Sequence, residues 1–222
     1  ALPILGSEMS GGVRNISVSN CQFLGTDVGL RFKSNRGRGG VVENIHISDI
    51  YMFNITTDSF LFDLYYGGKS ASESLADGDT TPVDQSPFPV SEETPVFRNI
   101  YVRDLVSRNA RRALFFNGLP EMNIENIHLE NAFITARYGA ELSESKEITF
   151  NNVTVIPEEG PAYMLHNVKQ FTADGIFSDD EKGNPLVEIT GERSEAVRLT
   201  GVPREQVEIA SGADSSEVVC LN

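Results

Sequence analysis

The chain has 222 residues, with 32 acidic against 18 basic side chains and a formal net charge of −14. Hydrophobic residues make up 40% of it, which is enough for a folded core and excludes a wholly disordered chain. No run of about 18 apolar residues occurs, so the sequence predicts no membrane-spanning helix. The acidic balance argues against non-specific nucleic-acid binding, because neutralising phosphates requires many cations. We therefore expect neither a membrane nor a nucleic acid among the partners.

A short pattern repeats along the chain: a polar residue, Asn, Ile, any residue, an apolar residue, any residue, then Asn or Asp before an apolar residue. Clear copies occupy residues 13–21, 42–50, 97–105 and 124–132, and weaker copies occupy 146–153 and 169–176. The first template position falls at residues 15, 44, 99, 126, 147 and 170, so the spacings are 29, 55, 27, 21 and 23. This self-similarity is the strongest signal in the sequence.

Within each copy apolar and polar residues alternate, which is the period of a strand with one buried face. Short strands that recur every 21 to 29 residues predict an all-β fold, a right-handed parallel β-helix (solenoid) whose coils stack about 4.8 Å apart. The recurring Asn and Asp suit coil corners, because they tolerate left-handed backbone and bond neighbouring main chain. The L-x-x-L-x-L spacing of leucine-rich repeats is absent. We expect one domain over residues 1–222, with 192–222 as a C-terminal cap region.

The spacing of 55 contains the one break in composition, which predicts a long inserted loop at residues 67–96. The break carries prolines at positions 82, 87, 89 and 95 and a run rich in Ser and Gly. Long loops in compact folds are often functional, and a disordered surface insertion is the alternative. The pair Asp77 and Asp79 in this loop is too sparse for a calcium site, so we expect no metal.

A basic segment stands out from the general acidity, because four cations fall within eight positions: Arg31, Lys33, Arg36 and Arg38. On a strand Arg31 and Lys33 project from one face, while Phe32 points the other way. Such a pair can clamp a carboxylate or a phosphate, with the Arg as a bidentate fork and the Lys as a point charge. A basic turn that pairs with local acids is the alternative. A third interpretation, an RGG-type RNA segment, conflicts with the single copy and the net charge.

Several other side chains are candidates for weaker roles. Tyr65 and Tyr66 lie at the mouth of the predicted loop, where one ring could form a platform for stacking a sugar, or either could belong to the core. His46 and His128 occupy the same template slot between inward apolar residues, so both should face outward. His166 has no obvious carboxylate or Ser partner in the sequence. We expect no cofactor.

Two stretches, residues 6–15 and residues 25–33 with Gly25-Thr26-Asp27 and Gly29-Leu30-Arg31-Phe32-Lys33, resemble glycoside hydrolase family 28, the polygalacturonases. Residues 62–66 and 118–122 resemble its bacterial exo-acting branch. The resemblance extends to about residue 190, and the family fold is the parallel β-helix. Arg31 and Lys33 match the family's Arg-x-Lys motif, which binds a galacturonate carboxylate.

The resemblance implies inverting hydrolysis of α-1,4 bonds in polygalacturonate or oligogalacturonates, by a secreted or periplasmic protein. In this reaction one carboxylic acid protonates the leaving oxygen, while carboxylates roughly 6.5–9.5 Å away activate water. The substrate-binding residues that we expect are Arg31, Lys33, Arg36, Arg38 and Tyr65.

The family's catalytic motifs, Asn-Thr-Asp, Asp-Asp and His-Gly, are absent upstream of the matched residues. The Asp-Asp pair that does occur, at residues 179–180, lies far downstream. The chain also begins without Met or a signal-like segment. We therefore expect a C-terminal part of such an enzyme, with the N-terminal coils missing, no catalytic residue and no activity alone. The alternative is a non-catalytic β-helix, a polysaccharide-binding or adhesin module. A pectate lyase is a weaker rival, because it would need a calcium site.

Overall fold

The computed structural model describes residues 4–5, 9–65, 86–179 and 183–221 and consists mainly of β-strands. The strands are β1 (Ile4–Leu5), β2 (Val13–Leu24), β3 (Leu30–Lys33), β4 (Val41–Phe53), β5 (Asp58–Asp63), β6 (Val96–Asn117), β7 (Ile124–Phe177), β8 (Val187–Thr190), β9 (Val197–Thr200), β10 (Val207–Ile209) and β11 (Val218–Leu221). Two 3₁₀ turns, η1 (Arg204–Gln206) and η2 (Ser215–Glu217), separate the last strands. Within these ranges there is no α-helix, and hence no helix long and apolar enough to cross a membrane.

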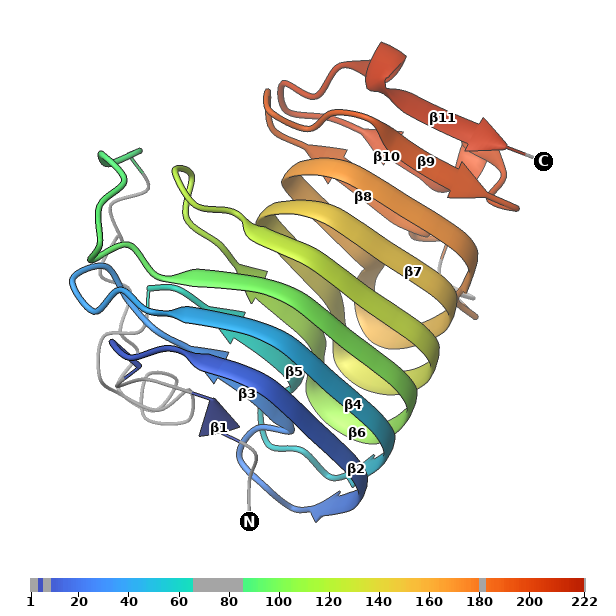
Figure 1. Ribbon diagram of the computed structural model, residues 1–222. Coiled ribbons are helices and arrows are strands. Elements are labelled where there is room, and N and C mark those ends of the chain that lie inside the picture. The colour runs from blue at the N-terminus through green and yellow to red at the C-terminus, as the bar shows by residue number, and fades with distance from the viewer. Residues whose placement is uncertain (1–3, 6–8, 66–85, 180–182, 222) are drawn as a thin grey trace.

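The strands form coils that stack along one axis from the N-terminal to the C-terminal end (Figure 1). All pairs of these strands are parallel. One row, which we call the β3 ladder, runs β1-β3-β5-β6-β7-β8-β10. A second row, the β4 ladder, joins β2, β4 and β6 and then β7, β9 and β11. The predicted parallel β-helix is thus confirmed.

Coil corners lie where the repeat places Asn. All six first template positions have left-handed backbone, with φ between 52° and 58°. At successive corners Asn44 donates a side-chain hydrogen bond to Asn15 over 3.2 Å, Asn99 to Asn44 over 3.2 Å, and Asn126 to Asn99 over 2.8 Å. Asn suits this role because it tolerates left-handed φ and carries both a donor and an acceptor. These amide ladders hold each coil in register with the next.

Phenylalanine rings fill the core between the two ladders. The Phe62 ring centroid lies 4.6 Å from that of Phe32 and 4.8 Å from that of Phe116. Phe60 and Phe97 also pack against Phe62, and all five rings are at most 1% exposed. Because side chains alternate along a strand, residues beside these phenylalanines face outward. The core therefore determines which side chains of β3 and β5 can meet a ligand.

The edge of β2 is covered less well than the rest of the solenoid. Within the described residues β2 pairs with β4 alone. Phe23 on its inward face is 3% exposed, but the other inward residues are only partly buried, namely Val13, Ile16, Val18 and Cys21. Their register partners on β4 are at most 2% exposed, namely Val42, Ile45, Ile47 and Ile50. The apolar underside of this first coil is thus open to another layer.

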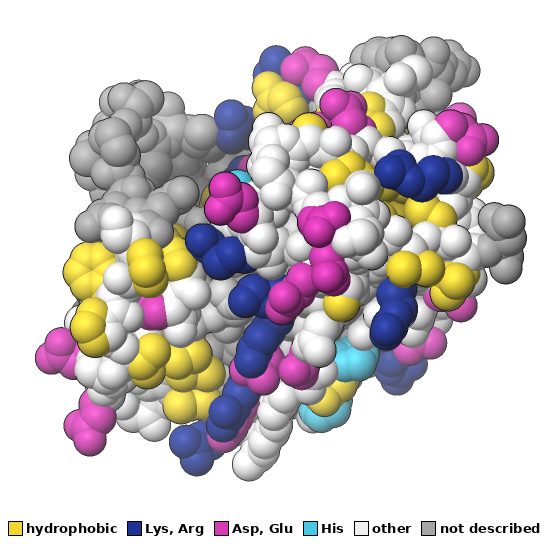
Figure 2. All heavy atoms as spheres, turned by 90° about the horizontal axis from the view of Figure 1, so that it is seen from above, with side chains coloured by type: hydrophobic (Ala, Val, Ile, Leu, Met, Phe, Trp, Pro, Cys, Tyr) yellow, Lys and Arg dark blue, Asp and Glu magenta, His cyan; other side chains and the backbone are white. Residues whose placement is uncertain are grey.

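Charged side chains on the β4 ladder alternate in sign from coil to coil. Glu43 forms ion pairs with Arg14 at 3.1 Å and with Arg98 at 2.7 Å, and Lys146 pairs with Glu125 at 3.1 Å. Arg98 and Glu125 are register partners. Figure 2 shows basic and acidic side chains alternating along one stripe of the surface. A shift of one coil against the next would break these pairs, so the stripe favours one register.

The predicted loop and the predicted cap differ in how much of each the structure describes. Most of the loop at 67–96 lies outside the described residues; residues 86–95 are described, and β6 begins at Val96. In the region 192–222 the strands β9, β10 and β11 continue the two ladders. The boundaries of the domain, loop and cap remain predictions.

Replacing Phe62 by Ala should destabilise the fold by about 3–5 kcal/mol, because it leaves a cavity among four other rings. Urea unfolding followed by circular dichroism measures this change in the free energy of unfolding. Phe53→Ala is the matched control, because the Phe53 side chain is 41% exposed. Equal losses of stability in the two variants would contradict the proposed core.

Candidate functional site

The predicted clamp pair lies on the outer face of β3. Leu30 and Phe32 point into the core, with exposures of 0% and 1%, so Arg31 and Lys33 share the opposite face. Arg31 is 6% exposed, and its Nη1 lies 3.8 Å from Oδ2 of Asp27. Lys33 is half-buried. The same-face arrangement predicted from the sequence is therefore present, with Arg31 held more deeply than Lys33.

Polar side chains from later coils extend the face alongside these cations. The strand register places Lys33 in one row with residues from the next three coils, in the order Asp63, Asn117 and Ser143. Arg31 lies in a second row, which starts at Ile4 of β1 and continues beyond Arg31 as Leu61, Phe115 and Glu141. Neighbouring strands lie about 4.8 Å apart, so Lys33 and Asp63 are adjacent on the surface although 30 residues separate them. The β3 ladder thus carries a polar row next to the cations.

Asp63 is a functional candidate that the sequence analysis missed. Its Oδ1 accepts hydrogen bonds from the backbone N–H of Tyr65 over 3.0 Å and from Nδ2 of Asn117 over 3.1 Å. Burial raises the pKa of Asp63, and these hydrogen bonds offset only part of that effect. Asp63 is an acid at the end of an apolar strand, one coil after the strand that carries the Arg-x-Lys motif. That position was the signal available in the sequence.

Arg36 is bound to a local acid. Its Nε and Nη2 donate to the two carboxylate oxygens of Glu121 over 2.7 and 2.9 Å, and Nη2 also donates to the Ser86 carbonyl over 3.1 Å. The guanidinium carbon lies 5.2 Å from the Tyr65 ring centroid and 4.3 Å from that of Phe88. Arg36 therefore joins three separate loops. A contact between Arg36 and the substrate remains a prediction. The surroundings of Arg36 agree with the alternative, a basic turn that pairs with a local acid.

The ion pair between Arg36 and Glu121 shifts the pKa of both partners. Burial alone would raise the pKa of Glu121, but the hydrogen bonds from Arg36 hold that pKa below its usual value. The hydrogen bond to Glu121 raises the pKa of Arg36 in turn. Burial also raises the pKa of the Tyr65 phenol beside them. The charges of Arg36 and Glu121 are therefore held firmly at neutral pH.

Arg38 lies in a tight glycine turn. The backbone N–H groups of Gly37 and Gly39 donate to the Glu93 carbonyl over 3.0 and 2.9 Å. A Cβ on Gly39, which has φ of 59°, would lie 2.0 Å from the carbonyl oxygen of Glu92. Only glycine allows this approach. Arg38 is half-buried, and in the described part of the chain its Nη1 has no hydrogen-bond partner.

Tyr65 is fixed against the basic turn, because its backbone forms an isolated bridge with Asn35 and its ring lies over Arg36. The second candidate ring, Tyr66, lies outside the described residues, as do residues 6–8 of the family-like stretch. Tyr65 as a sugar-stacking platform remains a prediction.

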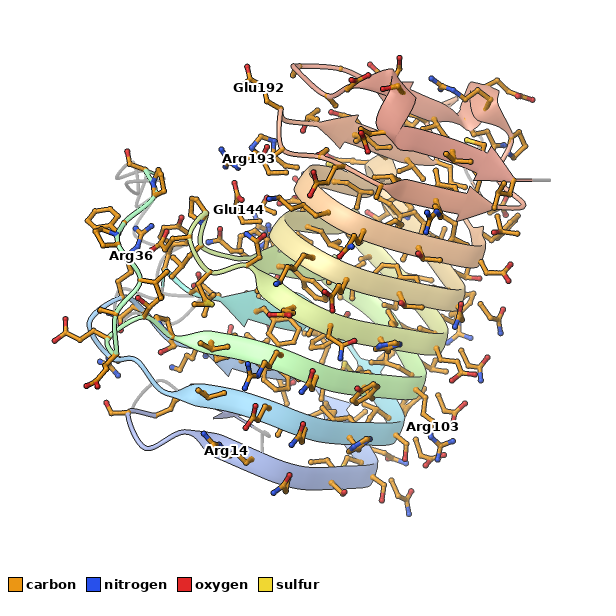
Figure 3. All side chains as sticks on the ribbon, turned by 45° about the horizontal axis from the view of Figure 1, so that its top comes forward. Arg14, Arg36, Arg103, Glu144, Glu192 and Arg193 are labelled. Carbon is orange, nitrogen blue, oxygen red and sulfur yellow. The ribbon has the colours of Figure 1, made fainter. Side chains whose placement is uncertain are left out.

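A second polar cluster lies on the same side of the solenoid (Figure 3). Glu144, which is 7% exposed, accepts from Asn167 Nδ2 over 2.7 Å and from Arg193 Nη2. His166, which has no obvious sequence partner, lies 3.0 Å from both Thr190 Oγ1 and Asn167 Nδ2. These groups hydrogen-bond one another, so the cluster is a polar corner of the coils whose own members are its partners.

The predicted outward histidines are confirmed on the opposite, β4 ladder. His46 and His128 stack on either side of Tyr101, with both centroid distances 4.9 Å. Within the described ranges no three His, Cys, Asp or Glu side chains are grouped to hold a metal ion. Asp77 and Asp79 lie outside those ranges.

Comparison with known proteins gives partial matches. A sequence model of the glycosyl hydrolases family 28 matches residues 4–81. The chain is 26% identical to a probable polygalacturonase from Vitis vinifera over 172 residues, which are 72% of this chain and 31% of that protein. It is 39% identical to a polygalacturonase from Ralstonia nicotianae (strain ATCC BAA-1114 / GMI1000) over 72 residues, which are 31% of this chain and 13% of that protein. The matched region thus spans about a third of the grape protein and a smaller part of the bacterial one. No solved structure matches significantly.

Glu121→Gln should lower the free energy of unfolding at pH 7 by about 1–3 kcal/mol, because it weakens hydrogen bonds to a charged group. A carboxyl whose pKa is lowered in the folded state stabilises above its ordinary pKa and loses this effect as pH falls through the lowered value. The difference between the variant and the original chain should therefore vanish in acid, which denaturant unfolding at several pH values measures.

Glu159→Gln serves as the control for Glu121→Gln, because Glu159 pairs with Arg137 in an exposed position with 53% of its side chain accessible. We expect a change below about 1 kcal/mol for this variant. A loss in Glu121→Gln that does not depend on pH would contradict the ionised pair.

Proposed function

We propose that this chain is part of a pectin-degrading glycoside hydrolase of the polygalacturonase type, and that its β3 ladder binds the substrate. The reaction is the inverting hydrolysis of α-1,4-galacturonosyl bonds in polygalacturonate or oligogalacturonates. The observation that carries this proposal is the pair Arg31 and Lys33, which project together from β3 inside the segment matched by the family. A secreted or periplasmic location and a likeness to the bacterial exo-acting branch belong to the same proposal.

The chemistry of the pair suits a uronate carboxylate. A guanidinium offers two parallel N–H donors that match the two oxygens of a carboxylate, and an ammonium adds a compact charge. The Arg31 side chain is 7% exposed, so less conformational freedom is lost when a ligand binds. Because the chain carries a net charge of −14, an anionic polymer is repelled elsewhere and attracted here.

We further propose that the catalytic aspartates lie outside this sequence, on coils that stack against the β1 and β2 end. Arg112 pairs with Asp58 at 2.6 Å and with Glu141 at 2.8 Å, so these two acids of the β3 ladder are already engaged. The open apolar underside of β2 offers a surface for a further coil. The greater length of the relatives supports the same assignment.

A non-catalytic β-helix that binds a polysaccharide, such as an adhesin module, is the second candidate. It is favoured by the clamp pair, because a binding module needs such a pair as much as an enzyme does. The two functions share the binding step and differ in the presence of an acid and a base. The coding sequence before Ala1 distinguishes them, because the enzyme requires the Asn-Thr-Asp and Asp-Asp motifs there.

Oligogalacturonate should bind the 222-residue chain through the clamp, so Lys33→Ala and Arg31→Ala should each raise Kd about 10- to 100-fold, as expected for a lost charge-assisted hydrogen bond. Isothermal titration at low salt measures this. Arg103→Ala is the control, because Arg103 is 61% exposed and lies on the opposite side of the solenoid (Figure 3). Equal Kd values in all four proteins would contradict the clamp.

Purified chain incubated with polygalacturonate should release no reducing ends, because the acid and base of the reaction are missing. A reducing-sugar assay run beside the binding measurement tests this. The same chain extended by upstream coils that carry Asn-Thr-Asp and Asp-Asp should become active. Turnover by the 222-residue chain would show that its own carboxylates suffice and would overturn the assignment of the aspartates to other coils.

A further inference from the structure

Asp63 lies beside the clamp in an unusual electrostatic setting. It is the register partner of Lys33 on one side and of Asn117 on the other, all three facing outward from the β3 ladder. The charge of Arg31 acts on it as well and lowers its pKa, against the stronger effect of burial. A carboxyl group therefore sits where the proposed ligand presents its own carboxylate, which a site built only for anions would avoid.

The two oxygens of this carboxyl differ. Oδ1 accepts from the Tyr65 N–H and from the Asn117 amide, which fix the plane and direction of the group. Oδ2 accepts no hydrogen bond from any described residue. Asp63 is half-buried, on the face that it shares with Lys33. Asp63 thus has one carboxyl oxygen fixed by hydrogen bonds and a second that accepts none from the described residues.

The chemistry of such an acceptor selects among anions. Arg31 and Lys33 attract any carboxylate, whereas Asp63 repels a second negative charge and stabilises a neutral donor. In a uronic acid the donors beside the carboxylate are ring hydroxyls. A site built to bond a hydroxyl rejects an analogue that does not present it, because its own polar group is then left unpaired.

We propose that Asp63 is a specificity-determining residue, whose Oδ2 accepts a hydrogen bond from a ring hydroxyl of the uronate held by Arg31 and Lys33. The cations set the affinity for the carboxylate, and Asp63 sets the preference for the hydroxyl geometry of the sugar. This assignment rests on the proposed galacturonate site and extends it to a residue outside the Arg-x-Lys pair.

The test compares two uronates of equal charge. D-Galacturonate and D-glucuronate are monomers that differ only in the orientation of the C4 hydroxyl beside the carboxylate, so both satisfy the clamp and only one satisfies Asp63. Titration calorimetry on the 222-residue chain should give a lower Kd for galacturonate. Asp63→Asn keeps the shape and the Oδ1 acceptor but replaces Oδ2 by a donor, and it should raise the Kd for galacturonate about tenfold and abolish the preference.

Controls separate this inference from the proposed function. Asp174→Ala removes an exposed acid of the β4 ladder and should change neither Kd. Arg31→Ala should weaken both ligands by the same factor and leave the preference intact. Thermal unfolding of Asp63→Asn checks that the variant is folded, and Asn117→Ala, which frees the carboxyl to rotate, should reduce the preference independently.

Each outcome decides one question. Binding of neither uronate by the original chain overturns the proposed function. Binding of both without preference, or a preference that survives Asp63→Asn while Arg31→Ala weakens both ligands, overturns the role of Asp63 and leaves the clamp standing. Loss of preference in Asp63→Asn with retained fold supports it.

Discussion

Hydrogen bonding between parallel strands of successive coils holds this molecule together, and it works only if every coil stays in register with the next. Left-handed corners at Asn15, Asn44, Asn99 and Asn126 turn the chain at equivalent points, and their amides bond one another. Apolar residues one step away then stack into a continuous core. Register is thus fixed three times, by backbone, by amide ladder and by core, and the alternating charges on the β4 ladder add a fourth constraint.

The proposed site follows from this register. Lys33, Asp63 and Asn117 are neighbours because each occupies the same place in its coil. The phenylalanine core beneath leaves them a single direction in which to point. A rigid ladder suits recognition of a polymer, because groups on adjacent strands repeat about every 4.8 Å along the solenoid axis. The surface needs no movement to present them.

The cations of the basic segment lie in two settings, the strand β3 and the turn that follows it. Arg31 and Lys33 lie on the strand and face outward, whereas Arg36 joins Glu121, Tyr65 and the loop at Ser86. A cation in a turn is free to find a local acid, and in a chain with 32 acidic residues one is available. Strand geometry fixes the face from which Arg31 and Lys33 project, and Arg31 has an acid, Asp27, 3.8 Å away. Whether a cation belongs to the proposed clamp therefore depends on its position in the coil more than on whether it is Arg or Lys.

The sequence alone determined the architecture, because a period of two within each strand and a corner at each Asn are local properties of the chain. It also determined that Arg31 and Lys33 share a face, since that needs only strand alternation. The partner of Arg36 and the candidacy of Asp63 were decided by tertiary structure. Glu121 is 85 residues from Arg36, and Asp63 reaches Lys33 only through the stacking of coils. The 55-residue spacing hid which coils were adjacent, and the register between them exists only once the solenoid has formed.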